Sequence, residues 1–224
     1  EYISVAKIKI LRYLIVANLS GLIVFTIMMS DVIYFFTFCN GMTSTAASAA
    51  MALRVIFGTI FLPLTGKLIK LTDKRETMIG AYLLGSVILL GVRFLSIPTG
   101  IEVFVYMIAM ALCTAIYWQI MPGIFYDVCE YDRIVNGKNR SATIVSFQGL
   151  VEAIAAGLGG QILGWILDAA GFDGTASVQT ENALLWIENS ATLIPIAFCL
   201  VACWALYKYP LTKKVYEDML KKAD

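Results

Sequence analysis

Histidine is absent from the chain, and its five cysteines form no CxxC pair. Zinc sites and thiol–histidine catalysts depend on these residues in close spacing, so the sequence argues against both. Paired catalytic carboxylates and a nucleophile elbow are missing as well, which argues against an enzyme. We therefore expect no catalytic residue, no metal site and no cofactor.

Charge is scarce too, since only 15% of the 224 residues are charged and the net charge is +1. No strongly basic face can be assembled from this balance, so we expect no nucleic-acid partner. Apolar residues make up 59% of the chain, whereas a soluble domain is nearer half apolar and a quarter charged. The composition indicates a membrane protein, with lipid as its surroundings.

Six apolar runs reach the length of about 20 residues that crosses a bilayer as a helix. They are residues 13–36, 46–66, 78–97, 101–126, 142–167 and 183–207. The connections are short, and no internal repeat or soluble domain is evident. We predict an all-α membrane protein with a six-helix bundle over residues 1–209 and a tail over 210–224. Leu211, Val215 and Met219 share one face of that tail, which is either an interfacial helix or a frayed end.

The basic residues predict the orientation. Fifteen of the 17 lysines and arginines fall in residues 1–12, 67–77, 127–141 and 208–224, and the intervening connections contain none. Positive charge concentrates on the cytoplasmic side of membrane proteins. We therefore predict that both termini are cytoplasmic and that the protein crosses the plasma or inner membrane several times.

The most polar stretch is Pro122–Gln148, which we interpret as a charge-rich loop between the fourth and fifth spans. Asp127, Glu130, Tyr131 and Arg140 are its candidate functional residues. They would lie at the inner membrane surface, where two spans enter and leave on the same side.

Four ionisable residues near the outer ends of spans are candidates for ion pairs. Consecutive antiparallel helices are usually neighbours, so we predict that Asp31 pairs with Arg54. Arg93 and Glu102 flank the next outer connection in the same way. Ionisable groups within spans are costly and therefore mark candidate functional sites.

Glu152 lies about 15 Å into the fifth span, close to the membrane midplane. Tyr117 and Trp118 lie at nearly the same depth in the fourth span. An aromatic ring beside a midplane polar group suits a sugar, whose C–H face stacks on the ring while its hydroxyls form hydrogen bonds. Helix packing is the alternative for these residues, as it is for Gly160 and Gly164 in their GxxxG spacing.

A family resemblance appears at the charge-rich stretch. The residues that carry it are Tyr126, Asp127, Val128, Cys129, Glu130, Tyr131 and Gly137, with Ser146 and Gln148 following. The chain resembles the glycoside–pentoside–hexuronide:cation symporters, the melibiose carrier family of the major facilitator superfamily. The resemblance covers nearly the whole chain and implies the carboxyl-terminal half of such a carrier.

The resemblance also implies roles for individual residues. Trp118 matches an aromatic that contacts sugar, and Gln148 matches a polar residue of the cavity. Asp127 and Tyr131 match an inner pair that governs closure. Two departures concern coupling: the family often has a lysine where this chain has Ala153, beside Glu152, and its Gly-x-Arg motif is one residue longer here, ending at Arg140.

The function implied is cation-coupled transport of sugars or glycosides by alternating access. A missing amino-terminal half would be the partner and would bind most of the coupling sodium ion or proton. We expect a fragment, since the chain opens on Glu1 rather than Met. The alternatives are a six-helix scaffold or partner subunit without transport, and a carrier of the same fold for another solute.

Overall fold

The computed structural model describes residues 8–176 and 178–223, and these residues form helices with no strand. The helices are α2 (Lys9–Tyr34), η1 (Phe35–Cys39), α3 (Ser44–Leu71), α4 (Lys74–Phe94), α5 (Thr99–Val135), α6 (Ser141–Ala170), α7 (Glu181–Ala191), α8 (Leu193–Lys208) and α9 (Lys213–Ala223). Six helical segments are long and apolar enough to cross a membrane. The predicted fold class, an all-α membrane protein with six spanning helices, is confirmed.

Two of the spanning segments are not single regular helices. The first runs through α2 and ends in the short π-helix η1. The sixth, Glu181–Lys221, contains α7 and α8, which meet at Thr192, and extends into α9. π-helical turns are rare and often mark functional positions. The spanning segments are also longer than the apolar runs of the sequence, because charged residues extend several of them.

The segment Pro122–Gln148 is the largest such difference, and its interpretation as a loop is wrong. α5 continues through its charged residues to Val135, and α6 begins at Ser141. Only residues 136–140 connect the two helices. The helix stops where Asn136 is followed by Gly137, whose φ of 61° suits glycine better than other residues. Asp127, Glu130 and Tyr131 therefore lie on helical turns.

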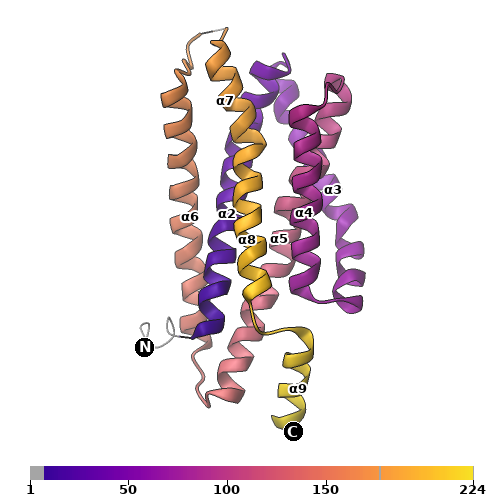
Figure 1. Ribbon diagram of the computed structural model, residues 1–224, viewed down its shortest axis with the longest axis vertical. Coiled ribbons are helices and arrows are strands. Elements are labelled where there is room, and N and C mark those ends of the chain that lie inside the picture. The colour runs from indigo at the N-terminus through magenta and orange to yellow at the C-terminus, as the bar shows by residue number, and fades with distance from the viewer. Residues whose placement is uncertain (1–7, 177, 224) are drawn as a thin grey trace.

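The helices pack around α2, which contacts α6 on one side and α8 on the other (Figure 1). α5 packs against both α3 and α4, and α4 also contacts α8. Consecutive helices are therefore not always neighbours: α3 contacts α5 much more extensively than α2. This arrangement decides which charged residues can meet.

One end of the bundle, the lower end in Figure 1, carries both described termini. We call it the basic end and define it by residues 8–12, 67–75, 127–141 and 208–221. The tail forms helix α9, which packs on the end of α5. Leu211 and Met219 are buried there, whereas Val215 is exposed, so two of the three apolar residues predicted to share a face are buried in the protein.

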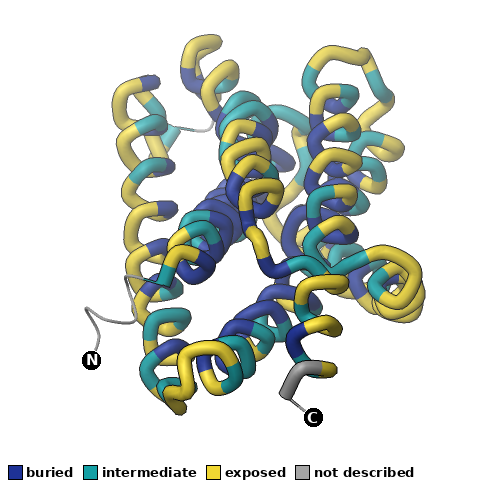
Figure 2. Tube along the Cα trace, turned by 60° about the horizontal axis from the view of Figure 1, so that its bottom comes forward, coloured by how far each residue is buried: buried dark blue, intermediate teal, exposed yellow. Residues whose placement is uncertain are grey.

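α3 and α6 bury fewer of their residues than the other spanning helices. Figure 2 shows α6 at the left of the molecule with mostly exposed residues, while α2 is largely buried. Gly160 and Gly164 belong to this exposed side, and a methyl group at either position would meet no atom within 4 Å. The described residues thus give the GxxxG spacing no packing partner.

Candidate functional site

Trp118 lies beside a shallow cavity of about 280 Å³ between α3 and α5. Trp118 is 43% exposed and touches Phe25 of α2 and Tyr117 edge-on. Arg54, Thr59 and Gln119 contribute the polar side chains of the cavity, and the remaining lining residues are apolar or glycine. The geometry therefore places an aromatic ring next to hydrogen-bonding groups in the middle of the spanning helices, where a molecule with an apolar face and polar edges could bind.

Gln119 links α5 to α3 at this cavity. Its amide nitrogen Nε2 donates to the carbonyl of Gly58 at 3.1 Å, and its Oε1 is buried without a hydrogen-bond partner. Gly58 permits the close approach of α3 to α5, because a Cβ there would lie 2.8 Å from the Cβ of Ala115. Arg54 of α3 and Trp118 of α5 therefore line the same cavity.

Arg54 does not pair with Asp31, so that prediction is wrong. The guanidinium Nη1 of Arg54 donates to Thr114 Oγ1 at 3.2 Å, and its Cζ lies 5.9 Å from the ring centre of Phe25. Asp31 is fully buried and accepts from the hydroxyl of Ser190 at 2.9 Å. The reason is the packing order: α3 lies on α5, whereas the end of α2 lies on α7.

Tyr117 points away from the cavity that it was predicted to line. It is fully buried, and its hydroxyl donates to Oδ1 of Asn18 in α2. Its ring therefore faces α2, whereas Trp118 lines the cavity between α3 and α5.

Gln148 and Glu152 lie one helical turn apart on α6 and are joined by a hydrogen bond, with Nε2 of Gln148 donating to Oε1 of Glu152 at 3.0 Å. Both side chains are half-buried. The predicted cavity residues therefore form two groups: Trp118 on α5 lines the cavity between α3 and α5, and the Gln148–Glu152 pair on α6 lies outside the lining of that cavity.

At the end opposite the basic end, Arg93 pairs with Glu188 rather than with Glu102. Nη1 of Arg93 lies 3.3 Å from Oε2 of Glu188, and its Nε donates to Asn189 at 3.1 Å. Glu102 instead accepts from Nδ2 of Asn40 at 2.8 Å. The predicted Arg93–Glu102 pair is therefore corrected, although both residues line one cavity of about 230 Å³ with Glu188.

At the basic end, Asp127 forms an ion pair with Lys74 from the start of α4. Nζ of Lys74 donates to both carboxylate oxygens at 2.7 Å and to the carbonyl of Gly123 at 3.2 Å. Asp127 and Lys74 line a second cavity together with Tyr216 of α9. Asp127 therefore ties α5 to α4 beneath the tail helix.

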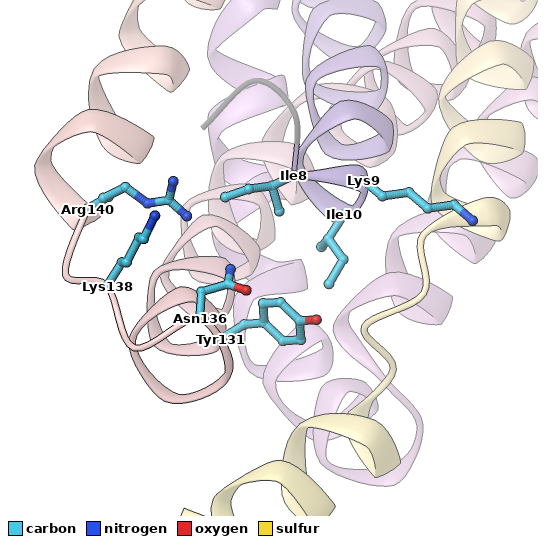
Figure 3. A pocket seen from close by; sticks show the side chains of 7 residues that line it. All are labelled: Ile8, Lys9, Ile10, Tyr131, Asn136, Lys138 and Arg140. Carbon is cyan, nitrogen blue, oxygen red and sulfur yellow. The ribbon is translucent and has the colours of Figure 1, made fainter. Parts of the chain in front are cut away.

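The connection between α5 and α6 holds another ion pair, between Asp132 and Arg140. Glu130 pairs with Arg133 along the same helix. Tyr131, Lys138 and Arg140 line a cavity of about 450 Å³ together with Lys9 (Figure 3). Figure 3 shows Lys9 extending away from the side on which Lys138 and Arg140 lie.

Several partners in these networks were not predicted as site residues. Asn18 could have been found, because it is a polar residue in the middle of the first apolar run. Lys74, Thr114 and Asp132 gave no such signal, since their importance depends on which helices are neighbours. Among residues 8–176 and 178–223, no group of three or more His, Cys, Asp or Glu side chains could hold a metal ion.

The chain is similar in sequence to known transport proteins. A family model described as MFS/sugar transport protein matches residues 4–213. The glucuronide carrier protein homolog of Escherichia coli (strain K12) is 25% identical over 164 residues, which are 71% of this chain and 34% of that protein. The isoprimeverose transporter of Lactiplantibacillus pentosus is 29% identical over 199 residues, which are 85% of this chain and 40% of that protein.

The inner membrane symporter YicJ of Escherichia coli (strain K12) is 31% identical over 134 residues, 57% of this chain and 28% of that protein. The chain thus spans well under half the length of each of these relatives. All three names describe carriers, transporters or symporters.

Proposed function

Because the chain belongs to the MFS/sugar transport protein family, we propose that it is the carboxyl-terminal half of a cation-coupled symporter for sugars or glycosides. The short coverage of its relatives supports the half-carrier proposal, since each of the three is at least twice as long as the segment matched. Carriers of this superfamily consist of two six-helix halves around a central site. The coupling sodium ion or proton would be bound mainly by the other half.

The cavity beside Trp118 carries this proposal. It combines an exposed aromatic ring with the polar groups of Arg54, Thr59 and Gln119 in the middle of helices whose other exposed residues are mostly apolar. A sugar ring can stack on the indole while its hydroxyls meet these polar groups. The Gln148–Glu152 pair on α6 is the second polar group that we assign to the solute cavity.

Alternating access requires that one end of the carrier open while the other closes. We assign closure of the basic end to the ion pair between Asp127 and Lys74 and to the connection around Arg140. By the positive-inside rule, this end would face the cytoplasm, with the carrier in the plasma or inner membrane. The ion pair of Arg93 with Glu188 would act at the opposite end.

The proposal is tested by Trp118→Ala in the complete carrier. Loss of a stacking partner typically costs about 0.5–1.5 kcal/mol, so the affinity for transported sugar should fall roughly twofold to tenfold. Solute binding to the purified carrier measures this change. Trp204→Ala is the matched control, because Trp204 is also exposed but lies on α8 in edge contact with Tyr13. Equal affinity in the wild type and Trp118→Ala would remove this cavity from the solute path.

A further inference from the structure

An apolar groove of about 430 Å³ lies between α3 and α4, the two helices at the right of Figure 1. α5 forms its floor, because α3 and α4 each pack on α5 far more extensively than on each other. Apart from Glu76 and three threonines, the lining residues are apolar or glycine. Two of the threonine hydroxyls, those of Thr65 and Thr72, already donate to backbone carbonyls of α3. The groove therefore suits a hydrocarbon chain.

The groove opens on an apolar side of the molecule. Every exposed residue of α4 from Gly80 to Phe94 is apolar or glycine. The cavity beside Trp118, in contrast, is lined by other residues of α3 and α5 and includes Arg54 and Gln119. A purely apolar surface on spanning helices matches the acyl chains of lipid, so we assign this side to lipid and the Trp118 side to solute.

The length of the groove matches one leaflet of a bilayer. Its lining begins at Thr72 and Glu76, next to the basic end, and reaches Ile88 on α4. The twelve residues from Glu76 to Ile88 extend about 18 Å along the helix. Half of the hydrocarbon core is about 15 Å thick. An acyl chain that enters at the basic end would therefore fill the groove and end near the midplane.

The rim of the groove carries charges of both signs. The side chain of Glu76 is 56% exposed, and its Oε1 lies 3.8 Å from Nη2 of Arg75. Arg75 donates through Nη1 to the carbonyl of Tyr209 at 3.0 Å, so the carboxylate of Glu76 is left to accept from another donor. An ammonium group carries N–H donors for a carboxylate, and a phosphate matches a guanidinium.

From this combination we propose that the groove between α3 and α4 binds one molecule of phosphatidylethanolamine. One acyl chain lies on α5 between the two helices, and the primary ammonium of the head group donates to Glu76. The phosphate lies on the Arg75 side of the rim. This lipid site is separate from the solute cavity and does not depend on which solute the carrier transports.

The test compares dioleoyl phosphatidylethanolamine with dioleoyl phosphatidylcholine, which differ only in three methyl groups on the nitrogen. Native mass spectrometry of the purified complete carrier in detergent measures binding of the first lipid molecule. The wild type should bind phosphatidylethanolamine about twofold to fivefold more tightly, because the methylated nitrogen has no N–H to donate to a half-exposed carboxylate. Glu76→Gln should bind the two lipids equally.

Gly80→Leu tests the groove itself. A Cβ at Gly80 meets no atom of the described residues within 4 Å, so the larger side chain fits the fold but occupies the groove. This variant should weaken binding of both lipids at least fivefold. If it is absent from the membrane, the comparison of Glu76→Gln with its control decides.

Each variant has a matched control. Glu181→Gln also removes a glutamate from the first turn of a helix, and Gly91→Leu adds the same side chain to α4 outside the groove. Both controls should bind the two lipids as the wild type does.

Equal affinity of the wild type for the two lipids overturns the inference, and so does an unchanged affinity in Gly80→Leu. Tighter binding of dioleoyl phosphatidylglycerol than of phosphatidylethanolamine overturns it as well, because that anionic head group has no ammonium for Glu76. A dimer mass that Gly80→Leu abolishes would assign the groove to a second copy of the carrier instead of lipid.

Discussion

The buried carboxylate of Asp132 holds together the connection between α5 and α6. Its side chain is fully buried and accepts from Nδ2 of Asn136 at 2.8 Å and from Nε of Arg140 at 2.9 Å. The carbonyl of Asp132 also accepts from the backbone N–H of Asn136 and of Lys138. One residue therefore binds the end of α5, the connection and the start of α6.

Asp132→Asn should destabilise the bundle. Removing one member of a buried ion pair leaves the other charge uncompensated, at a cost of about 3–5 kcal/mol. The Arg140 side chain is only 10% exposed, so water can compensate it little. Thermal unfolding of the purified chain in detergent should show a midpoint lower by roughly 10 °C.

Glu130→Gln is the control for this measurement, because it breaks the neighbouring pair of Glu130 with Arg133. That pair is much more exposed, at 29% and 62% of the two side chains, and exposed pairs contribute less than about 1 kcal/mol. If both variants lowered the midpoint of unfolding equally, the burial of Asp132 would not explain the loss of stability in Asp132→Asn.

At the scale of helices, Gly159 sets the distance between α6 and α2. A Cβ at this position would lie 2.7 Å from the Cβ of Thr26 and 3.5 Å from the carbonyl of Ile23. Small residues at such crossings let helix backbones approach closely where lipid supplies no hydrophobic drive. The next residue, Gly160, faces open space.

Gly159→Ala should therefore destabilise the chain relative to Gly160→Ala. The two substitutions gain the same helix propensity, about 1 kcal/mol, but only the first meets a packed neighbour, at a cost of about 1–3 kcal/mol. Thermal unfolding in detergent compares them directly. Equal midpoints for the two variants would show that α6 moves away from α2 at little cost.

The helices themselves were predictable because apolar runs of about 20 residues leave few other structures in a membrane. The ends of the helices were not predictable. Asp127, Glu130 and Asp132 are of types common in loops, but they lie on helical turns of α5, which ends at Val135. The predicted pair of Arg54 with Asp31 failed because the sequence places α3 next to α2 whereas the structure packs α3 on α5. The predicted pair of Arg93 with Glu102 failed although α4 and α5 are neighbours, because the side chain of Arg93 meets Glu188 and Asn189 of α7.

The candidate site was predicted in part. Trp118 followed from the family resemblance, and Arg54 was selected as a charge within a span, but their shared cavity needed the packing of α3 on α5. Tyr117 was misplaced because depth along a helix does not specify the direction in which a side chain points.

At the scale of the whole molecule, the basic end predicts an orientation. A cysteine replacing Gly174, between α6 and α7, should react with an impermeant thiol reagent added to intact cells that contain the otherwise cysteine-free complete carrier. A cysteine replacing Lys138, between α5 and α6, should not react until the cells are opened. Positive charge stays on the cytoplasmic side during insertion, so the reverse pattern would invert the assignment of the basic end.

The length of α5 has a mechanical consequence. Its 37 residues extend about 55 Å, well beyond a hydrocarbon layer of about 30 Å. Proline breaks the rigidity of a helix, and Pro122 lies one turn beyond Trp118 and about 20 Å short of Val135. A bend of about 10° at this hinge swings the far tip of the helix by roughly 3 Å. Such a bend would move the shorter part of α5, from Pro122 to Val135, together with the charges around Asp132.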